Sequence, residues 1–246
     1  MDKVFVITVC RDADKMLEGT ILSVLNQTYE HLHYVIVDGA SSDGSVDVIR
    51  KYEKRLAAWV SEPDKGIYDA MNKGVKIVKS LLDKDESAWV NFMNAGDVFS
   101  DKNVVSDVFC RDIAESVKVV VGHFNQCYGD KKTTKAADSI DLLPLWMPFC
   151  HQATFVRNDY CIFDTRYKIA ADYNLFYKLY DKYGSDAFLA VDRIVADFQM
   201  EGSTTYRNLM LTAKEGLQIR SKHKNVFWWK LWLKYQLWKL GMRKSM

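Results

Sequence analysis

The chain is poor in residues that separate domains and has no stretch that could cross a membrane. It holds three prolines in 246 residues and shows no low-complexity tract or internal repeat. We therefore expect one domain with a C-terminal appendage. None of its apolar stretches approaches the roughly 20 residues of a membrane-spanning helix. The opening MDKVFVITVC also lacks the length and the cleavage site of a signal peptide.

Motifs that would assign other functions are missing too. The five cysteines are odd in number and lack C-x-x-C spacing. This argues against a disulfide framework or a structural zinc site, and it predicts a cytoplasmic protein. The sequence has no G-x-G-x-x-G, no G-x-x-x-x-G-K-[ST] and no G-x-S-x-G. It therefore indicates neither dinucleotide binding, nor a P-loop, nor a serine hydrolase.

Negative charge is absent from the C-terminal end of the chain. The formal net charge is +2, but no acidic residue follows Glu215. Before the terminal segment the chain carries 26 basic and 32 acidic residues. This balance argues against a body that binds nucleic acid. It predicts that the segment 220–244 meets an anionic membrane surface. The segment holds eight basic residues: Arg220, Lys222, Lys224, Lys230, Lys234, Lys239, Arg243 and Lys244.

The same C-terminal segment is rich in tryptophan. Its stretch FWWKLWLKYQLWKL, residues 227–240, holds four of the seven tryptophans. At helical spacing these residues form an aromatic and an aliphatic stripe separated by Lys230 and Lys234. Such an amphipathic helix predicts peripheral binding to the inner face of the cell membrane. Packing of this helix on its own domain, or on a second copy in a homo-oligomer, remains the alternative.

Apolar runs and helical periodicities alternate along the chain, which predicts an α/β fold with a mainly parallel sheet. Ser45 is expected to cap the second helix. The predicted strands are 4–10, 34–37, 58–60, 88–93, 117–124 and 188–200. The predicted helices are 17–25, 45–52, 68–81, 171–183 and 206–219.

Polar residues follow three of these predicted strands. Thr8 and Arg11 lie at the end of the first strand, Asp38 ends the second, and Asp97 follows the strand over 88–93. The carboxyl ends of parallel strands meet at one edge of a sheet, where ligands bind. Carboxylates there suit a base edge, a ribose and a hard metal ion that bridges phosphates. Each Asp next to a glycine could alternatively serve a turn alone.

Several stretches together resemble glycosyltransferase family 2, the inverting GT-A-type enzymes of polysaccharide assembly. They are VITVCRDAD, SVLNQTY, YVIVDGASSDGSVDVI, SEPDKGIYDAMNKG and WVNFMNAGD, and the resemblance continues more weakly through CHQATFVR and IAADYNLFYKL. It implies a GT-A-type (Rossmann-like), mainly parallel sheet flanked by helices over 1–205. The remaining residues, 206–246, would form the helical basic-aromatic appendage.

The resemblance also implies a donor site and a metal. Asp97 would bind Mn²⁺ or Mg²⁺, although Asn94 and Gly96 stand where the family's motif usually has two further carboxylates. A divalent ion needs only one or two protein carboxylates when phosphates supply oxygens. The remaining donor-side residues are Thr8, Arg11, Asp38, Asp64, Lys65, Asp69, Asn94, Ala95 and Gly96.

On the acceptor side, the resemblance makes Asp172 the catalytic base, although Ala171 replaces the usual preceding Glu. His151 and Gln152 would line the acceptor. The implied activity is transfer of a sugar from a UDP-sugar to a hydroxyl of a lipid-linked saccharide in surface polysaccharide biosynthesis. Two alternatives remain: a nucleotidyltransferase using a similar sheet, and a non-catalytic membrane-docked scaffold with a degenerate donor site. Asp172 could also be a simple helix cap.

Overall fold

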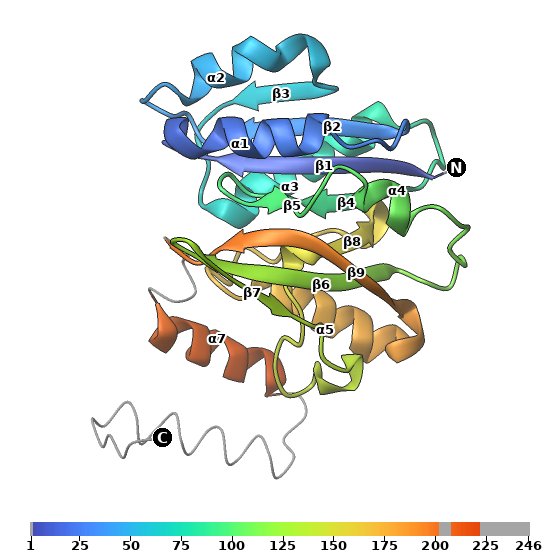
Figure 1. The fold of residues 1–246 in the computed structure, drawn as a ribbon. Coiled ribbons are helices and arrows are strands. Elements are labelled where there is room, and N and C mark those ends of the chain that lie inside the picture. Colours follow the sequence, from blue (N-terminus) through green and yellow to red (C-terminus); the bar gives the residue numbers. More distant parts are fainter. Residues whose placement is uncertain (1, 202–207, 222–246) are drawn as a thin grey trace.

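The computed structural model describes residues 2–201 and 208–221 (Figure 1). They form a nine-stranded mixed sheet with helices on both faces. The predicted helix over 227–240 and the first residues of the predicted helix 206–219 lie outside the described residues.

The first four long strands are parallel, as the sequence predicts. The β-branched runs of β1, β2 and β4 are buried, and the helices between the strands are the crossovers that a parallel sheet requires. The strands are β1 (Lys3–Cys10), β2 (Leu32–Asp38), β3 (Ala58–Ser61) and β4 (Ala88–Phe92), in the order β3-β2-β1-β4. The crossover helices are α1 (Asp14–Leu25), α2 (Ser45–Tyr52), continued by η1 (Glu53–Arg55), and α3 (Ile67–Leu81).

The second half of the sheet is mixed. Its strands are β5 (Val98–Phe99), β6 (Val119–Tyr128), β7 (Lys131–Lys135), β8 (Thr154–Arg157) and β9 (Phe188–Gln199). β8 is antiparallel to both β4 and β6, whereas β9 runs parallel to β6. β5 and β7 add antiparallel edges to β9 and β6. The sequence predicts β6 and β9 but not the three short strands, because β5 and β8 are brief and β7, KKTTK, is fully exposed.

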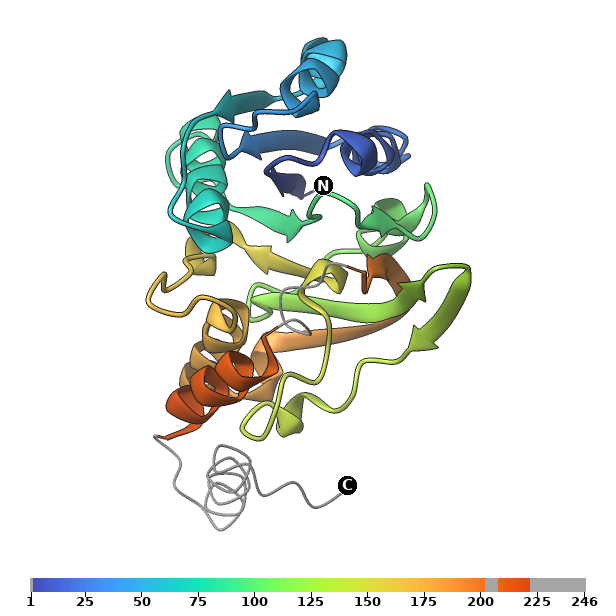
Figure 2. The same cartoon turned by 90° about the vertical axis from the view of Figure 1, so that its left-hand side faces the viewer.

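Two apolar cores lie on opposite faces of the sheet. Alternate residues of β1 serve both: Phe5 and Ile7 face one core, while Val4 and Val6 face the other. The first core lies under α3, α5 (Ala171–Tyr183) and α7 (Leu209–Arg220), and the second under α1, α2 and α4 (Val104–Val108) (Figure 2). Short 3-10 turns complete the chain: η2 (Ile140–Leu142), η3 (His151–Ala153), η4 (Asn158–Tyr160) and η5 (Ser185–Ala187).

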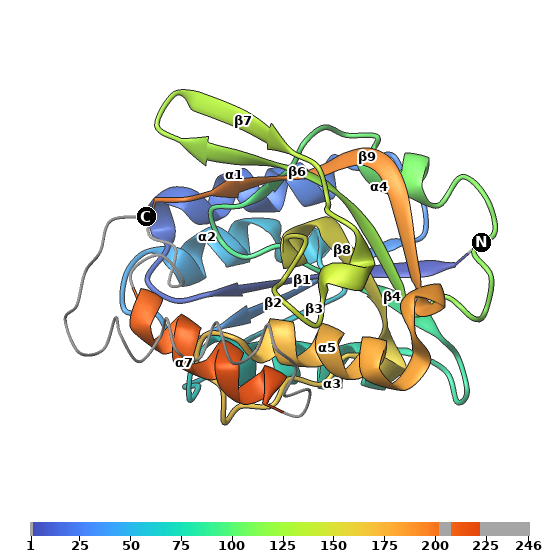
Figure 3. The ribbon, with the colours of Figure 1, turned by 90° about the horizontal axis from the view of Figure 1, so that it is seen from below.

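The predicted C-terminal segment, residues 206–246, is described only over 208–221, where helix α7 packs on the domain. It lies beside α5 (Figures 2 and 3), and its Ile219 belongs to the core under α3 and α5. The basic composition that suggested an appendage begins only at Arg220, the last residue of this helix. Within residues 2–201 and 208–221, no helix has the length and apolarity needed to cross a membrane.

Ser45 does not cap α2, contrary to the prediction. It is the first helical residue, and its hydroxyl accepts a hydrogen bond from the Ala13 N–H at 2.8 Å. The Ser45 N–H donates instead to Asp43 Oδ1 at 2.9 Å. Ser45 therefore ties the start of α1 to the start of α2.

Candidate active site

The candidate residues lie along the carboxyl edge of the parallel strands. Cys10 of β1 pairs with Asp38 of β2, and Asp38 pairs with Ser61 of β3, so these strand ends are level. β6 runs in the same direction as β4, because β8 is antiparallel to both, and β9 is parallel to β6. The turns after these strands therefore meet at one edge.

Thr8 and Asp38, which the sequence predicts to contact the nucleoside, lie inside the protein in β1 and β2. Thr8 is fully buried, and its hydroxyl contacts Tyr34 Oη at 2.8 Å and the Met93 carbonyl at 2.7 Å. The Asp38 carboxylate is also fully buried; it accepts from the Ser61 hydroxyl at 2.6 Å, the Ser41 N–H at 3.0 Å and the Ser41 hydroxyl. These two residues therefore connect the ends of neighbouring strands through buried hydrogen bonds.

Asp64 and Arg11 lie nearer the surface than Asp38, and both are next to Gly39. A Cβ added to Gly39 would press on Asp64 Oδ2 and lie 3.4 Å from Arg11 Cβ, so a larger residue there would displace the Asp64 side chain. Asp64 Oδ1 accepts the Gly66 N–H at 2.8 Å, and Gly66 has φ +120, a conformation that favours glycine. The side chains of Asp64 and Arg11 thus both lie against Gly39, just after β2.

Asp69 and Lys65 belong to the start of α3. Asp69 Oδ2 accepts the Lys65 N–H at 3.0 Å and lies 3.9 Å from Lys73 Nζ. The Asp69 side chain therefore fixes the turn before α3. Lys65 is exposed, so its ammonium is free to move toward a phosphate.

A tight turn over 94–97 follows β4. The Asp97 N–H donates to the Asn94 carbonyl at 3.0 Å, and the Ala95 N–H donates to the Val9 carbonyl at 3.3 Å. Gly96 has φ +101, and its N–H donates to Thr20 Oγ1 at 2.9 Å. An added Cβ at Gly96 would also lie 3.1 Å from Met16 Sδ, so this position favours glycine twice over.

Asp97 is 5% exposed and is held by two donors. Its Oδ2 accepts from Gln152 Nε2 at 2.7 Å and its Oδ1 from the Gln199 N–H at 2.9 Å. Burial raises the pKa of Asp97 to about 6, against the lowering effect of these hydrogen bonds. Gln152, which the sequence predicts to line the acceptor, is itself 2% exposed and donates to Asp97.

His151 joins the turn after β4 to the candidate base. Its Nε2 lies 3.2 Å from Asn94 Nδ2, and its Nδ1 lies 3.2 Å from Asp172 Oδ2. A proton on Nδ1 satisfies both contacts, because the imidazole then donates to the carboxylate and accepts from the amide. The side chains of His151 and Asp172 are 19% and 18% exposed. Asn94, His151 and Asp172 thus form a continuous polar line from three separate segments.

Tyr68 is a site residue that the sequence prediction missed. Its hydroxyl lies 2.6 Å from the Ile169 carbonyl and 3.1 Å from Asp172 Oδ1. Burial, followed by the charge of Asp172, raises the pKa of Tyr68 well above its usual value, so it remains a proton donor. Its position in the quoted stretch SEPDKGIYDAMNKG was the available signal. Nothing in the sequence indicated the contact across about a hundred residues.

Comparison with known proteins shows the family of the chain. The sequence model described as "Glycosyl transferase family 2" matches residues 5–179.

The chain belongs to glycosyl transferase family 2.

Curated relatives in this family match parts of the chain. A mycobacterial PGL/p-HBAD biosynthesis glycosyltransferase from Mycobacterium bovis is 27% identical over 177 residues, covering 65% of this chain and 62% of its own. The putative teichuronic acid biosynthesis glycosyltransferase TuaG of Bacillus subtilis is 32% identical over 95 residues, covering 38% and 36%. An uncharacterized glycosyltransferase of Mycobacterium tuberculosis is 36% identical over 104 residues, covering 42% and 37%. The matches thus span between about a third and three fifths of these relatives.

Solved structures confirm the predicted GT-A fold. Staphylococcus aureus TarS 1-349 in complex with UDP has a TM-score of 0.63 at 16% identity, covering 89% of this chain and 70% of its own. Mannosyltransferase PcManGT from Pyrobaculum calidifontis, in complex with GDP-Man and Mn²⁺, has a TM-score of 0.64 at 18% identity, covering 90% and 64%. At these identities the likeness establishes the fold alone.

Within the described residues, the candidate site offers too few oxygen atoms of its own to complete the coordination of a divalent ion, so a bound phosphate would have to supply the rest. No group of three or more His, Cys, Asp or Glu in residues 2–201 and 208–221 could hold a metal. Asn94 Oδ1 is buried and accepts no hydrogen bond within these residues, while each Asp97 oxygen keeps one further lone pair. One carboxylate and one amide oxygen suit a hard cation that takes its other oxygens from phosphates.

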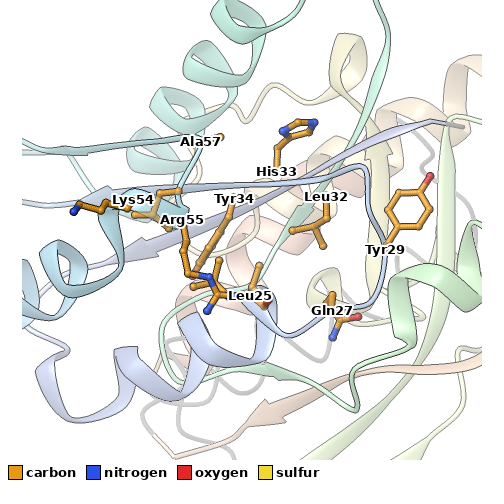
Figure 4. A pocket seen from close by; sticks show the side chains of 11 residues that line it. Leu25, Gln27, Tyr29, Leu32, His33, Tyr34, Lys54, Arg55 and Ala57 are labelled. Atoms are coloured by element: carbon orange, nitrogen blue, oxygen red, sulfur yellow. Dashed lines mark hydrogen bonds between the residues drawn. The ribbon is translucent and has the colours of Figure 1, made fainter.

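A hollow of the described surface lies elsewhere. It measures about 460 Å³ and is lined by residues that include Leu32, His33, Lys54 and Arg55 (Figure 4). Leu32 begins β2, so this hollow lies at the amino edge of the parallel strands. Family 2 chemistry, by contrast, needs the carboxyl edge where Asp64, Asp97 and Asp172 are gathered.

Proposed function

We propose that the chain is an inverting glycosyltransferase that moves a sugar from a UDP-sugar to a hydroxyl of a saccharide acceptor. The observation that carries this proposal is the line from Asn94 through His151 to Asp172. It sets a partly exposed carboxylate opposite the turn that bears Asp97. Transfer with inversion in one displacement needs a base on one side of the sugar and a binding site for the leaving diphosphate on the other.

In the proposed step the acceptor oxygen attacks the anomeric carbon of the donor. The bond from that carbon to the diphosphate oxygen breaks, and UDP leaves with the electron pair. The acceptor proton passes to Asp172, which an imidazole, a backbone N–H and the Tyr68 hydroxyl hold in place. A divalent ion held by Asp97 and Asn94 would neutralise charge on the departing diphosphate.

A uridine donor is the choice that the comparisons favour. TarS was solved with UDP, and PcManGT with GDP-Man, so the fold accepts more than one base. In this chain, the side chains of Asp64 and Arg11 both lie next to Gly39, which follows the buried Asp38. We assign the base or ribose contact to Asp64 and the diphosphate contacts to Arg11 and Lys65.

A panel of nucleotide-sugars, screened by thermal shift with and without Mn²⁺, tests this proposal. A ligand at a hundred times its dissociation constant stabilises the folded state by about 2.7 kcal/mol. We expect UDP with Mn²⁺ to raise the melting temperature and UTP with a sugar phosphate to give no pyrophosphate. Pyrophosphate release would favour the nucleotidyltransferase, and no shift with any nucleotide would favour the non-catalytic scaffold. The anomeric configuration of the product, measured by NMR, checks inversion.

We also propose that the segment 220–244 holds the enzyme on the inner face of the membrane, beside a lipid-linked acceptor. The argument rests on its sequence, because residues 222–246 lie outside the described structure. Anionic lipid contributes roughly 1 kcal/mol for each nearby Lys or Arg. About four of its eight charges would then contribute roughly 4 kcal/mol, before any insertion of tryptophan.

Co-sedimentation with anionic vesicles tests the membrane proposal. A truncation after Ser221 keeps Arg220 and the whole of α7, so it removes the tail without opening the domain. We expect the full chain to sediment and the truncated chain to remain in solution. Replacing Lys131, Lys132 and Lys135 of β7 by Gln removes exposed charge elsewhere and should change little. Equal sedimentation of full and truncated chains would contradict the proposal. If neither sediments, dissociation of an oligomer on truncation would point to a protein partner.

A further inference from the structure

Glu215 is a buried charge that the proposed chemistry does not use. It lies on α7, among the apolar residues Leu217 and Ile219, and only 4% of it is exposed. A glutamate is almost never buried this far unless its charge is compensated. It is also the last acidic residue of the chain.

The partners of Glu215 are three consecutive backbone N–H groups. Its Oε1 accepts from Lys168 N at 2.8 Å, and its Oε2 accepts from Ile169 N and Ala170 N, both at 3.0 Å. Successive N–H groups that converge in this way form a nest that binds an anion. Here the anion is a side chain from a helix some 45 residues further along the chain.

This nest stands directly before the proposed base. Ala170 is the N-terminal cap residue of α5, has no side-chain cap, and precedes Asp172 by two residues. The same loop is held from its other side by the Tyr68 hydroxyl, which bonds the Ile169 carbonyl at 2.6 Å. In this short loop, Glu215 therefore binds backbone N–H groups, and Tyr68 binds a backbone carbonyl.

We infer that Glu215 is a positioning residue for Asp172, and that α7 is therefore part of the catalytic unit. Fixing the nest fixes the first turn of α5, and with it the contacts of Asp172 with His151 and Tyr68. A shift of about 1 Å in a reacting group can lower a rate by about 10²-fold. This inference rests on the proposed role of Asp172. It gives α7, one of the three helices that cover the first core, a function beyond packing.

The substitution Glu215→Gln tests the inference in the full chain. The amide oxygen can replace one carboxylate oxygen, but the NH₂ group then faces a backbone N–H. We expect kcat to fall between about 10-fold and 10²-fold while the donor KM stays within about twofold. Amide hydrogen exchange should become faster at residues 168–170 and stay unchanged in α3. A merely structural loss would lower the amount of folded enzyme without this division between kcat and KM.

Leu217→Ala is the matched control, because Leu217 is a buried residue of the same helix outside the nest. It should lower the melting temperature and leave kcat nearly unchanged. Wild-type kcat in Glu215→Gln, or equal losses of kcat in both variants, would overturn the inference. Asp172→Asn is measured alongside: if it keeps full activity, the proposed base is wrong, whatever Glu215 does.

Wild-type protein provides a second measurement if Glu215→Gln does not fold. The amides of residues 168–170 precede a helix and belong to no strand, so without Glu215 they would exchange quickly. We expect them to exchange as slowly as the amides inside α5. Fast exchange at these three positions in the wild-type chain would contradict the inference.

Discussion

The two halves of the domain hold their polar side chains in different ways. Up to the turn over 94–97, buried polar residues such as Thr8 and Asp38 bond to the backbone and hydroxyls around them and brace the strand ends. Beyond this turn, His151 and Asp172 contact each other and stay partly exposed, with side-chain exposures of 19% and 18%. The first half therefore buries the polar groups that join its strand ends, and the second half leaves polar groups open to solvent, where the proposed substrates could reach them.

Asp172→Asn is expected to have the largest effect. It keeps the shape and one acceptor oxygen but cannot take the acceptor proton, so turnover should fall by at least about 10²-fold. Donor binding, which belongs to the first half, should stay near normal. Steady-state kinetics with isothermal titration of UDP separates the two. Loss of donor affinity in proportion to rate would make Asp172 a binding residue and remove the distinction between the halves.

Asp97→Asn should have the next largest effect. Without the carboxylate the response to Mn²⁺ should disappear, and turnover should fall by about 10²-fold. The measurement is the rate over a range of Mn²⁺ concentrations. Asp101→Asn is the control, because Asp101 is an acidic residue four positions away that pairs with Arg193. Unchanged turnover of Asp97→Asn at saturating Mn²⁺ would refute the metal assignment.

The pH dependence of the wild-type enzyme should show the state of Asp97. Its pKa is raised to about 6, so the carboxylate is protonated below that pH and metal-dependent turnover should fall about tenfold between pH 7 and pH 5. The folded state binds this proton more tightly than the unfolded chain does. The stabilising contribution of protonated Asp97 is therefore full below about pH 4 and is lost as pH rises through 6. Activity and this part of the stability should change in opposite directions; parallel changes would contradict the assignment.

A smaller pair of effects should separate Asp38 from Asp64. Asp38→Asn leaves buried donors of Ser41 and Ser61 poorly satisfied, so unfolding free energy should fall by about 1–3 kcal/mol. Asp64→Asn keeps the bond from the Gly66 N–H, so stability should hold while donor affinity falls about three- to tenfold. Thermal melts and donor titrations measure both. A greater loss of donor affinity in Asp38→Asn, without loss of stability, would return the nucleoside contact to Asp38.

Sequence reasoning predicts the first half of the fold more completely than the second. Buried apolar runs identify β1, β2 and β4, because parallel strands covered on both faces are largely apolar. β7 gives no such signal, since its residues are polar and exposed. The short β5 and β8 acquire their structure from neighbouring strands, and no local pattern reports that pairing.

The site divides in a similar way. The family resemblance indicates Asp97 and Asp172, and the structure places both at the predicted edge. It does not reveal that Gln152 lies beneath Asp97, or that the Tyr68 hydroxyl reaches Asp172. Both contacts are made by tertiary packing between segments that are far apart in sequence. A residue type in a motif suggests a role, but only the packed fold decides which side chains are buried supports.

The edges of the sheet bear on how the protein behaves when crowded. β3 has four residues and β5 has two, while β7 carries three lysines among five exposed residues. Short or lysine-rich edges offer a poor template for adding a strand from a neighbouring molecule. Copies gathered at high local density can therefore collide without joining their sheets into aggregates. That tolerance would suit an enzyme concentrated on a two-dimensional surface.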